Sequence, residues 1–325
     1  MSDAATDLGL WALPVAVFGG AIRVGTPFLF VSLGECITER SGRVNLGLEG
    51  TLVMGAMTGY GVSYLAATHM AGLHEIAPWI APWLGVLAAG LVGILLGILH
   101  AVICNQPKVN YVAVGIAMMI FGAGFASFLG KPLIQPSAPK LPDINFGWWS
   151  SIEQVRFALR VNVLFLVGIV LAPVLAWALK CTRWGLILRL AGESEEAAAA
   201  MGYSASRIRV CATAFGGFLA GIGGSFLSLY YPGSWNEQIS SGQGLMAVAL
   251  VIFARWDPIR CLWASLMFGG VGSLGSALQG QNLTSSSLSY LWNSAPYVLT
   301  LVIMIITSSR DHAMAGAPGA LVAEK

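Results

Sequence analysis

Charged side chains are scarce in this chain of 325 residues. Asp, Glu, Lys and Arg make up 10% of the sequence, against about 25% in a typical soluble domain, and apolar residues make up 56%. No charged residue lies between Glu75 and Lys108, although about 20 apolar residues suffice for a helix to cross a bilayer. The apolar runs do not alternate as barrel strands do. We therefore expect an all-α polytopic membrane protein.

The sequence also lacks the residue groupings of several functional classes. Its five cysteines are scattered without a C-x-x-C pair, which argues against a disulfide framework or a zinc site. The nearest approach to a Walker A loop, Gly124 to Lys131, has one residue too many between its glycines and continues with Pro132. No nucleophile, base and acid stand out as a set. We expect a chain that is not an enzyme, binds no cofactor or metal, and has no nucleic acid partner.

Long hydrophobic segments recur along the chain, separated by polar connections. They predict about nine crossings, one of which, within 241–258, is so short that it suggests a broken or re-entrant helix. We expect one transmembrane domain over 1–309, a long polar loop over 131–158 and a disordered tail over 310–325. Glycine is abundant, and pairs at small-xxx-small spacing predict close helix packing: Gly55/Gly59, Gly93/Gly97 and Gly217/Gly221.

The densest group of charges forms an island from Lys180 to Arg209, between two hydrophobic segments. It must lie in water at one membrane face. Within it, Ser194 to Ala200 predicts a short helix, because Ser is a good N-cap, acidic residues suit the positive end of the helix dipole, and Ala has the highest helix propensity. Gly202 is expected to end this helix. The island is either an ordinary solvated loop or a knob that docks into another protein.

A second charged segment, from Glu39 to Gly50, follows the first apolar span. Asn45 and Glu49 are four residues apart, so they share one face if a helix has begun there. The glycines around them allow the backbone to break or to approach a neighbour closely. The segment is either a packed, kinked helix start or a gate for a solute, and both can hold.

Arg23 lies inside the first apolar span. An arginine within a membrane is costly unless it faces a partner or a wet cavity. We favour a buried structural ion pair. A place on a translocation path and a side chain that reaches up to the membrane surface are the alternatives.

Three segments resemble the permease subunits of ABC importers in the simple-sugar and nucleoside group. The family's Gly-Glu-Asn-Pro-Glu-Ala-Ala-like stretch is similar to residues 192–198 here, with Ser194-Glu195 in place of Asn-Pro. Its E-R-x-G-x-x-N-L-G-x-E-G-like segment is similar to residues 39–50. Its G-x-G-x-x-x-x-A-x-x-x-F-G-x-W-x-P-like pattern is similar to residues 242–258, with Ala254 in place of Gly.

The resemblance implies a type II-like importer permease whose coupling helix sits in a groove of a separate ATPase subunit. That ATPase, and not this chain, would use ATP and Mg. The coupling residues are then Gly192, Glu193, Ser194, Glu195, Glu196, Ala197, Ala198, Met201 and Gly202. It also implies a second homologous permease, in a heterodimer rather than a homodimer, and a periplasmic or lipid-anchored solute-binding protein. The solute would be a nucleoside, a purine or a simple sugar.

Basic residues predict the orientation in the bilayer. Alternating loops place most Lys and Arg residues on one side, the island included, and only Lys131, Lys140, Arg156 and Arg160 on the other. By the positive-inside rule the island is cytoplasmic, the N-terminus lies outside and the C-terminus lies inside. The resemblance places the chain in a bacterial plasma membrane.

Polarity near helix breaks selects the candidates for the translocation path. They are Asn45, Glu49, Asn110 and Gln243, and Arg23 joins them because it lies inside an apolar span. The alternative function is a secondary transporter driven by an ion gradient, because such carriers also use broken helices and buried charges. A channel is a third possibility, which the lack of a repeated pore motif disfavours. The short cytoplasmic helix separates these functions, since a self-sufficient carrier does not require it.

Overall fold

Helices dominate the computed structural model, which describes residues 11–70, 77–280, 288, 291–292, 294–307 and 318–320. The first half holds α1 (Ala12–Arg40), α2 (Leu48–His69), α3 (Ala77–Cys104), α4 (Tyr111–Gly130), a 3-10 turn (Lys131–Leu133), β1 (Asp143–Asn145), α5 (Glu153–Ala158) and β2 (Arg160–Asn162). The second half holds α6 (Val163–Cys181), α7 (Arg183–Glu193), α8 (Glu195–Ala200), α9 (Ala205–Leu229), α10 (Gln243–Phe253), α11 (Pro258–Gly280) and α13 (Ala295–Thr307).

Six of the described helices are long and apolar enough to cross a membrane, namely α1, α3, α4, α6, α9 and α11. The sequence predicted a span at each, with ends that differ by a few residues. Three further predicted spans correspond to α2, to the 11-residue α10 and to α13, which begins at Ala295 instead of residue 290. The count of nine crossings stays a prediction. The predicted tail lies outside the described residues except for 318–320.

The centre of the bundle is α9, which packs against α1, α2 and α3. A Cβ atom added to Gly93 of α3 would lie 2.0 Å from the carbonyl oxygen of Gly217, and one added to Gly55 of α2 would lie 2.6 Å from that of Gly221. Only glycine permits backbones to approach so closely. The close packing that the glycine pairs predicted is confirmed.

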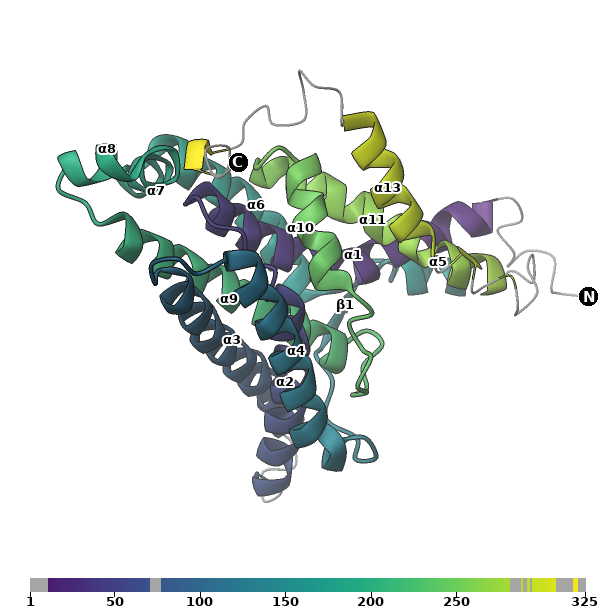
Figure 1. Ribbon diagram of the computed structural model, residues 1–325. Coiled ribbons are helices and arrows are strands. Elements are labelled where there is room, and N and C mark those ends of the chain that lie inside the picture. Colours follow the sequence, from purple (N-terminus) through teal and green to yellow (C-terminus); the bar gives the residue numbers. More distant parts are fainter. Residues whose placement is uncertain are drawn as a thin grey trace, which may run out of the picture.

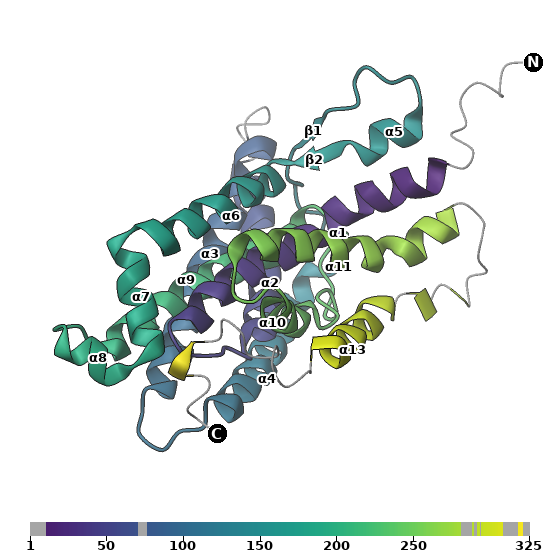
Figure 2. The ribbon, with the colours of Figure 1, turned by 90° about the horizontal axis from the view of Figure 1, so that it is seen from above.

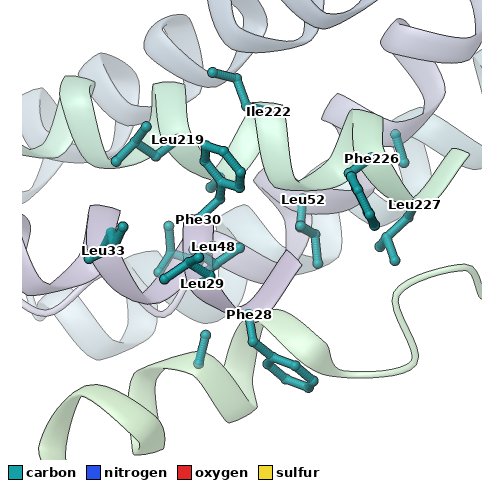
Figure 3. Close-up of a cluster of buried hydrophobic side chains, with 14 of the residues drawn as sticks. Phe28, Leu29, Phe30, Leu33, Leu48, Leu52, Leu219, Ile222, Phe226 and Leu227 are labelled. Carbon is teal, nitrogen blue, oxygen red and sulfur yellow. The ribbon is translucent and has the colours of Figure 1, made fainter. Parts of the chain in front are cut away.

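Large apolar side chains fill the space between these helices. Phe28, Leu29, Phe30 and Leu33 of α1 are each at most 2% exposed, and the Phe28 ring lies 6.1 Å from that of Phe268 in α11. Figure 3 shows Leu29 and Phe30 near Leu48 of α2, with Leu219, Ile222, Phe226 and Leu227 along α9. This core fixes the relative positions of α1, α2 and α9.

Different polar structures project from the two ends of the bundle. Helices α7 and α8 lie at one end, and α5 with the β1–β2 pair lies at the other (Figures 1 and 2). We call these the α8 end and the α5 end. The sequence predicted only a polar loop over 131–158, whereas the structure places the 3-10 turn, β1 and α5 there. In the antiparallel β1–β2 pair, Asp143 lies opposite Asn162.

Candidate functional site

At the α8 end, one serine joins two short helices. Ser194 ends α7 and begins α8, and its Oγ accepts a hydrogen bond from the backbone N–H of Ala197 at 3.2 Å. The helix closes at Gly202, whose φ of +80° favours glycine. The N–H of Tyr203 donates to the carbonyl of Ala198 at 2.9 Å. The short helix predicted from the sequence is confirmed. Helix α7, which precedes it, was not predicted.

A single arginine ties this pair of helices to the bundle. Arg209 in α9 is 6% exposed and donates from Nε to the Ser41 carbonyl at 3.3 Å and from Nη2 to the Ala191 carbonyl at 3.4 Å. Its Nη1 pairs with Glu195 at 3.1 Å. Gly192 packs so tightly that an added Cβ would lie 2.2 Å from the Arg40 carbonyl oxygen. The ends of α1, α7, α8 and α9 are therefore linked, which residue types alone could not indicate.

The tip of α8 faces away from the bundle. Ala198 is buried with Ala191 and Ala205, which holds one side of the helix in place. The other side exposes Glu196, Ala199, Ala200, Met201 and Tyr203. Met201 is 67% exposed. Glu195 is exposed as well, so the tip combines small and apolar side chains with two acidic groups, a surface that suits insertion into a groove of another protein.

Helix α2 begins at Leu48, three residues before the apolar span that the sequence predicted from Thr51. The backbone N–H of Asn45 donates to Oε1 of Glu35 at 2.7 Å. Glu35 precedes the end of α1 by five residues, so it lies about 7.5 Å inside that end. Asn45 comes before the first residue of α2 and its Oδ1 accepts from the N–H of Gly47 at 3.0 Å. The condition under which Asn45 and Glu49 would share one helix face is not met, because the helix starts only at Leu48.

Glu49 is the acceptor around which the start of α10 is arranged. Its carboxylate accepts hydrogen bonds from the Ser240 hydroxyl at 2.5 Å and from the N–H groups of Gly242 at 3.0 Å and Gly244 at 2.6 Å. Glu49 itself lies in the first turn of α2. The N-termini of two helices thus meet at one carboxylate, where their partial positive charges stabilise it.

The segment that contains α10 is irregular before Gln243 and helical from Gln243 to Phe253. Toward the α5 end, Trp235 donates from Nε1 to the Gly130 carbonyl at 2.9 Å. Toward the α8 end, Trp256 donates from Nε1 to Glu39 at 2.5 Å, and Arg40 donates from Nε to the Trp256 carbonyl at 3.0 Å. The prediction of a broken or re-entrant helix is confirmed in that α10 has only 11 residues and follows irregular backbone, whereas its crossing of the membrane stays a prediction. Irregular backbone at this depth occurs where it is buried in protein or lines a wet cavity.

One ion pair fixes the turn that follows α10. Lys180 at the end of α6 lies 3.2 Å from Asp257. Burial alone would raise the pKa of the Asp257 carboxyl, but hydrogen bonds from the backbone of Arg260 and from Lys180 outweigh it and hold this pKa below its usual value. The carboxylate therefore stays charged and keeps the turn against α6.

The remaining path candidates occupy different places. Gln243 is the first residue of α10, beside the Glu49 junction, and its Oε1 is buried without a hydrogen-bond partner within the described residues. Asn110 is an exposed N-cap of α4, and its Oδ1 accepts from the N–H groups of Val112 at 2.8 Å and Ala113 at 3.2 Å. The junction therefore brings together Glu49 and Gln243, but not Asn110.

Arg23 is held by a carbonyl and aromatic rings. Its Nη1 donates to the Phe157 carbonyl at 3.0 Å, and its guanidinium lies 4.2 Å from the centre of the Phe157 ring and 5.9 Å from that of Tyr231. Among the described residues, no acidic side chain forms an ion pair with it. The favoured ion pair is therefore corrected: Arg23 fastens α5 to α1.

The sequence is similar to that of known transporter permeases over most of its length. Residues 17–308 match the model of a family described as "Branched-chain amino acid transport system / permease component". A nucleoside ABC transporter permease of Lactococcus lactis subsp. cremoris is 30% identical over 86% of this chain and 88% of its own length. A guanosine ABC transporter permease of Bacillus subtilis is 28% identical over 86% and 87%. A Haloferax volcanii protein provisionally named as a glucose ABC transporter permease is 30% identical over 82% and 78%.

The family model covers nearly the whole bundle, including the Glu49 junction, the α7–α8 pair and α10. Six long apolar helices among the described residues agree with a multi-pass membrane protein. The chain belongs to the family of membrane-spanning permease components of ABC transporters.

Proposed function

We propose that this chain forms half of the translocation pathway of an ABC importer for a nucleoside or purine-like solute or a simple sugar. A separate ATPase subunit, which uses ATP and Mg, would drive transport through α8 as the coupling helix. The observation that carries this proposal is the arrangement of the helix pair α7 and α8. Its exposed tip is small and mostly apolar, and its base is fastened through Arg209 to α1, α7 and α9.

The contacts provide a route from α8 to the membrane interior. Arg209 links α8 to Ser41 at the end of α1, where Arg40 and Glu39 hold Trp256 after α10. The other end of α10 is held by Glu49. A shift of α8 would therefore move α1 and α10 against the junction of Glu49 and Gln243, which we place beside the path of the solute. Asn45 and Asn110 stay predictions for that path.

The solute class rests on the relatives and on the sparse charge of the interior. Two of the relatives are named for nucleosides or guanosine and one for glucose. These solutes are polar and uncharged, so a pathway with few charged side chains suits them.

The proposal includes the partners and the orientation expected from the sequence. The α8 end faces the cytoplasm of a bacterial cell, with the N-terminus outside and the C-terminus inside. A second, homologous permease completes the pathway, more suitably a different chain than a copy. A periplasmic or lipid-anchored binding protein delivers solute to the α5 end.

Replacement of Glu193 to Ala197 by a Gly/Ser linker of equal length tests the coupling role. The variant removes the Ser194 cap and the acidic first turn of α8 but leaves the membrane helices intact. We expect a folded, membrane-inserted chain whose complex hydrolyses ATP without uptake of labelled nucleoside or sugar. Unchanged uptake would refute the assignment of α8 as the coupling helix.

A further inference from the structure

An apolar groove of about 570 Å³ lies where α7 folds back over α6 and α9. Leu175 and Leu179 of α6, Leu188 of α7 and Phe215 of α9 form much of its wall. Of all the residues that line it, only Arg207 is charged. No step of the proposed transport cycle uses this groove.

The groove spans the boundary between hydrocarbon and water. Its α6 and α9 walls belong to helices that are apolar enough to cross the membrane, and they lie in the final turns of α6 and the first turns of α9. Beside them on α6, Trp177 is 62% exposed, as expected of a face toward lipid. At the rim, Trp184 is 80% exposed, and tryptophan is enriched where a membrane meets water.

The rim carries positive charge, and no acidic side chain among the described residues forms an ion pair with it. Nearby, Lys180 pairs with Asp257 and Arg209 with Glu195. Arg207 and Arg183 are exposed, and within the described part of the chain neither forms an ion pair. An arginine guanidinium binds phosphate well, because its planar fork of donors matches the phosphate oxygens.

We propose that this groove binds an anionic phospholipid from the leaflet at the α8 end. One acyl chain covers the apolar walls, and the phosphate lies at Arg207. Inorganic phosphate would satisfy the arginine but leave the walls exposed, and a neutral lipid would cover the walls without matching the net positive rim. The bound lipid supports α7, from which α8 continues. The effect of this support on the coupling helix rests on the proposed function, whereas the binding of the lipid does not.

Native mass spectrometry tests the binding directly. The full chain, with the subunits that accompany it, is exposed in mild detergent to equal amounts of phosphatidylglycerol and phosphatidylcholine. We expect preferential retention of phosphatidylglycerol, and Arg207→Gln should reduce it about fivefold, or about 1 kcal/mol for one cation at an anionic surface. Arg260→Gln changes an exposed arginine on α11 that does not line the groove, so it is the matched control and should leave the retention unchanged. Equal retention of both lipids, or no effect of Arg207→Gln, would overturn the proposal.

Two exposed cysteines provide a second readout. Cys211 lines the groove, whereas Cys181 does not. In delipidated protein, added phosphatidylglycerol should slow maleimide labelling of Cys211 but not of Cys181, and inorganic phosphate at the same concentration should have no effect. Protection by phosphate alone would identify a simple anion site. Protection of Cys211 in the delipidated sample by a copurifying subunit would identify a protein interface. Either result would refute the lipid proposal.

Discussion

At the scale of single residues, Glu49 holds the start of α10 in place through hydrogen bonds. Its two oxygens accept three hydrogen bonds at the start of α10. Glu49→Gln keeps the size of the side chain but replaces one acceptor oxygen by an NH₂ group, which is itself a donor and faces the hydroxyl and N–H donors at the start of α10. Because buried donors would then lack an acceptor, we expect the free energy of unfolding to fall by about 1–3 kcal/mol, seen as a lower melting temperature in detergent. Glu196→Gln, at an exposed position on α8, is the control and should melt normally.

Arg209 is the second residue whose role depends on distant partners. Arg209→Lys keeps the charge but loses the fork that reaches Ser41, Ala191 and Glu195 together. We expect amide hydrogen exchange across residues 191–200 to accelerate at least about tenfold, the equivalent of about 1.4 kcal/mol. Arg183→Lys, at an exposed position on α7, should leave exchange unchanged. Equal protection in both variants would show that Arg209 does not hold α8.

At the scale of helices, the contact between α3 and α9 depends on glycine. A Cβ at Gly93 would lie 2.0 Å from the Gly217 carbonyl oxygen, so Gly93→Ala must separate the two helices. We expect a loss of at least about 2 kcal/mol in stability, measured by thermal unfolding in detergent. Gly124→Ala in α4 meets no atom within 4 Å and should melt at least as high as the unmodified chain. Similar melting of the two variants would contradict the close packing.

The exposed side of α8 can be tested without disturbing its base. Ala200→Arg adds a bulky charge at the tip, where the side chain faces away from the bundle. We expect the chain to fold normally but to lose copurification of the ATPase subunit. Ser137→Arg makes a comparable change at an exposed position toward the α5 end and should retain the ATPase. Retention of the ATPase by Ala200→Arg would place the docking surface elsewhere.

Elements whose ends depend on neighbouring residues were predictable from the sequence, whereas elements whose ends depend on residues far away in the sequence were not. The ends of α8 were predictable because Ser194 and Gly202 act on their own backbone neighbours. The start of α2 was not, because it depends on Glu35 of α1 and on the close approach of Gly50 to Met118 of α4. The charges of α7 looked like those of a loop, although its apolar side covers α6 and α9. Arg23 had no partner to be found in sequence, because its partner is a backbone carbonyl.

At the scale of the whole molecule, polar contacts at the α8 end continue into the interior through α1 and α10. Arg209 reaches Ser41, and Arg40 reaches Trp256. The α5 end is connected separately, through Arg23 and Phe157. We infer that each end can be displaced by its own partner, while the glycine-packed helices α2, α3 and α9 between them move as a unit.

The most direct test of this account is nucleoside and sugar uptake by proteoliposomes that contain the chain with and without its copurifying subunits. We predict that a labelled solute accumulates only when an ATPase subunit, a second permease and a binding protein are present, and only with ATP and Mg on the α8 side. Uptake by the chain alone, driven by an ion gradient and unaffected by ATP, would contradict the account and identify a secondary transporter.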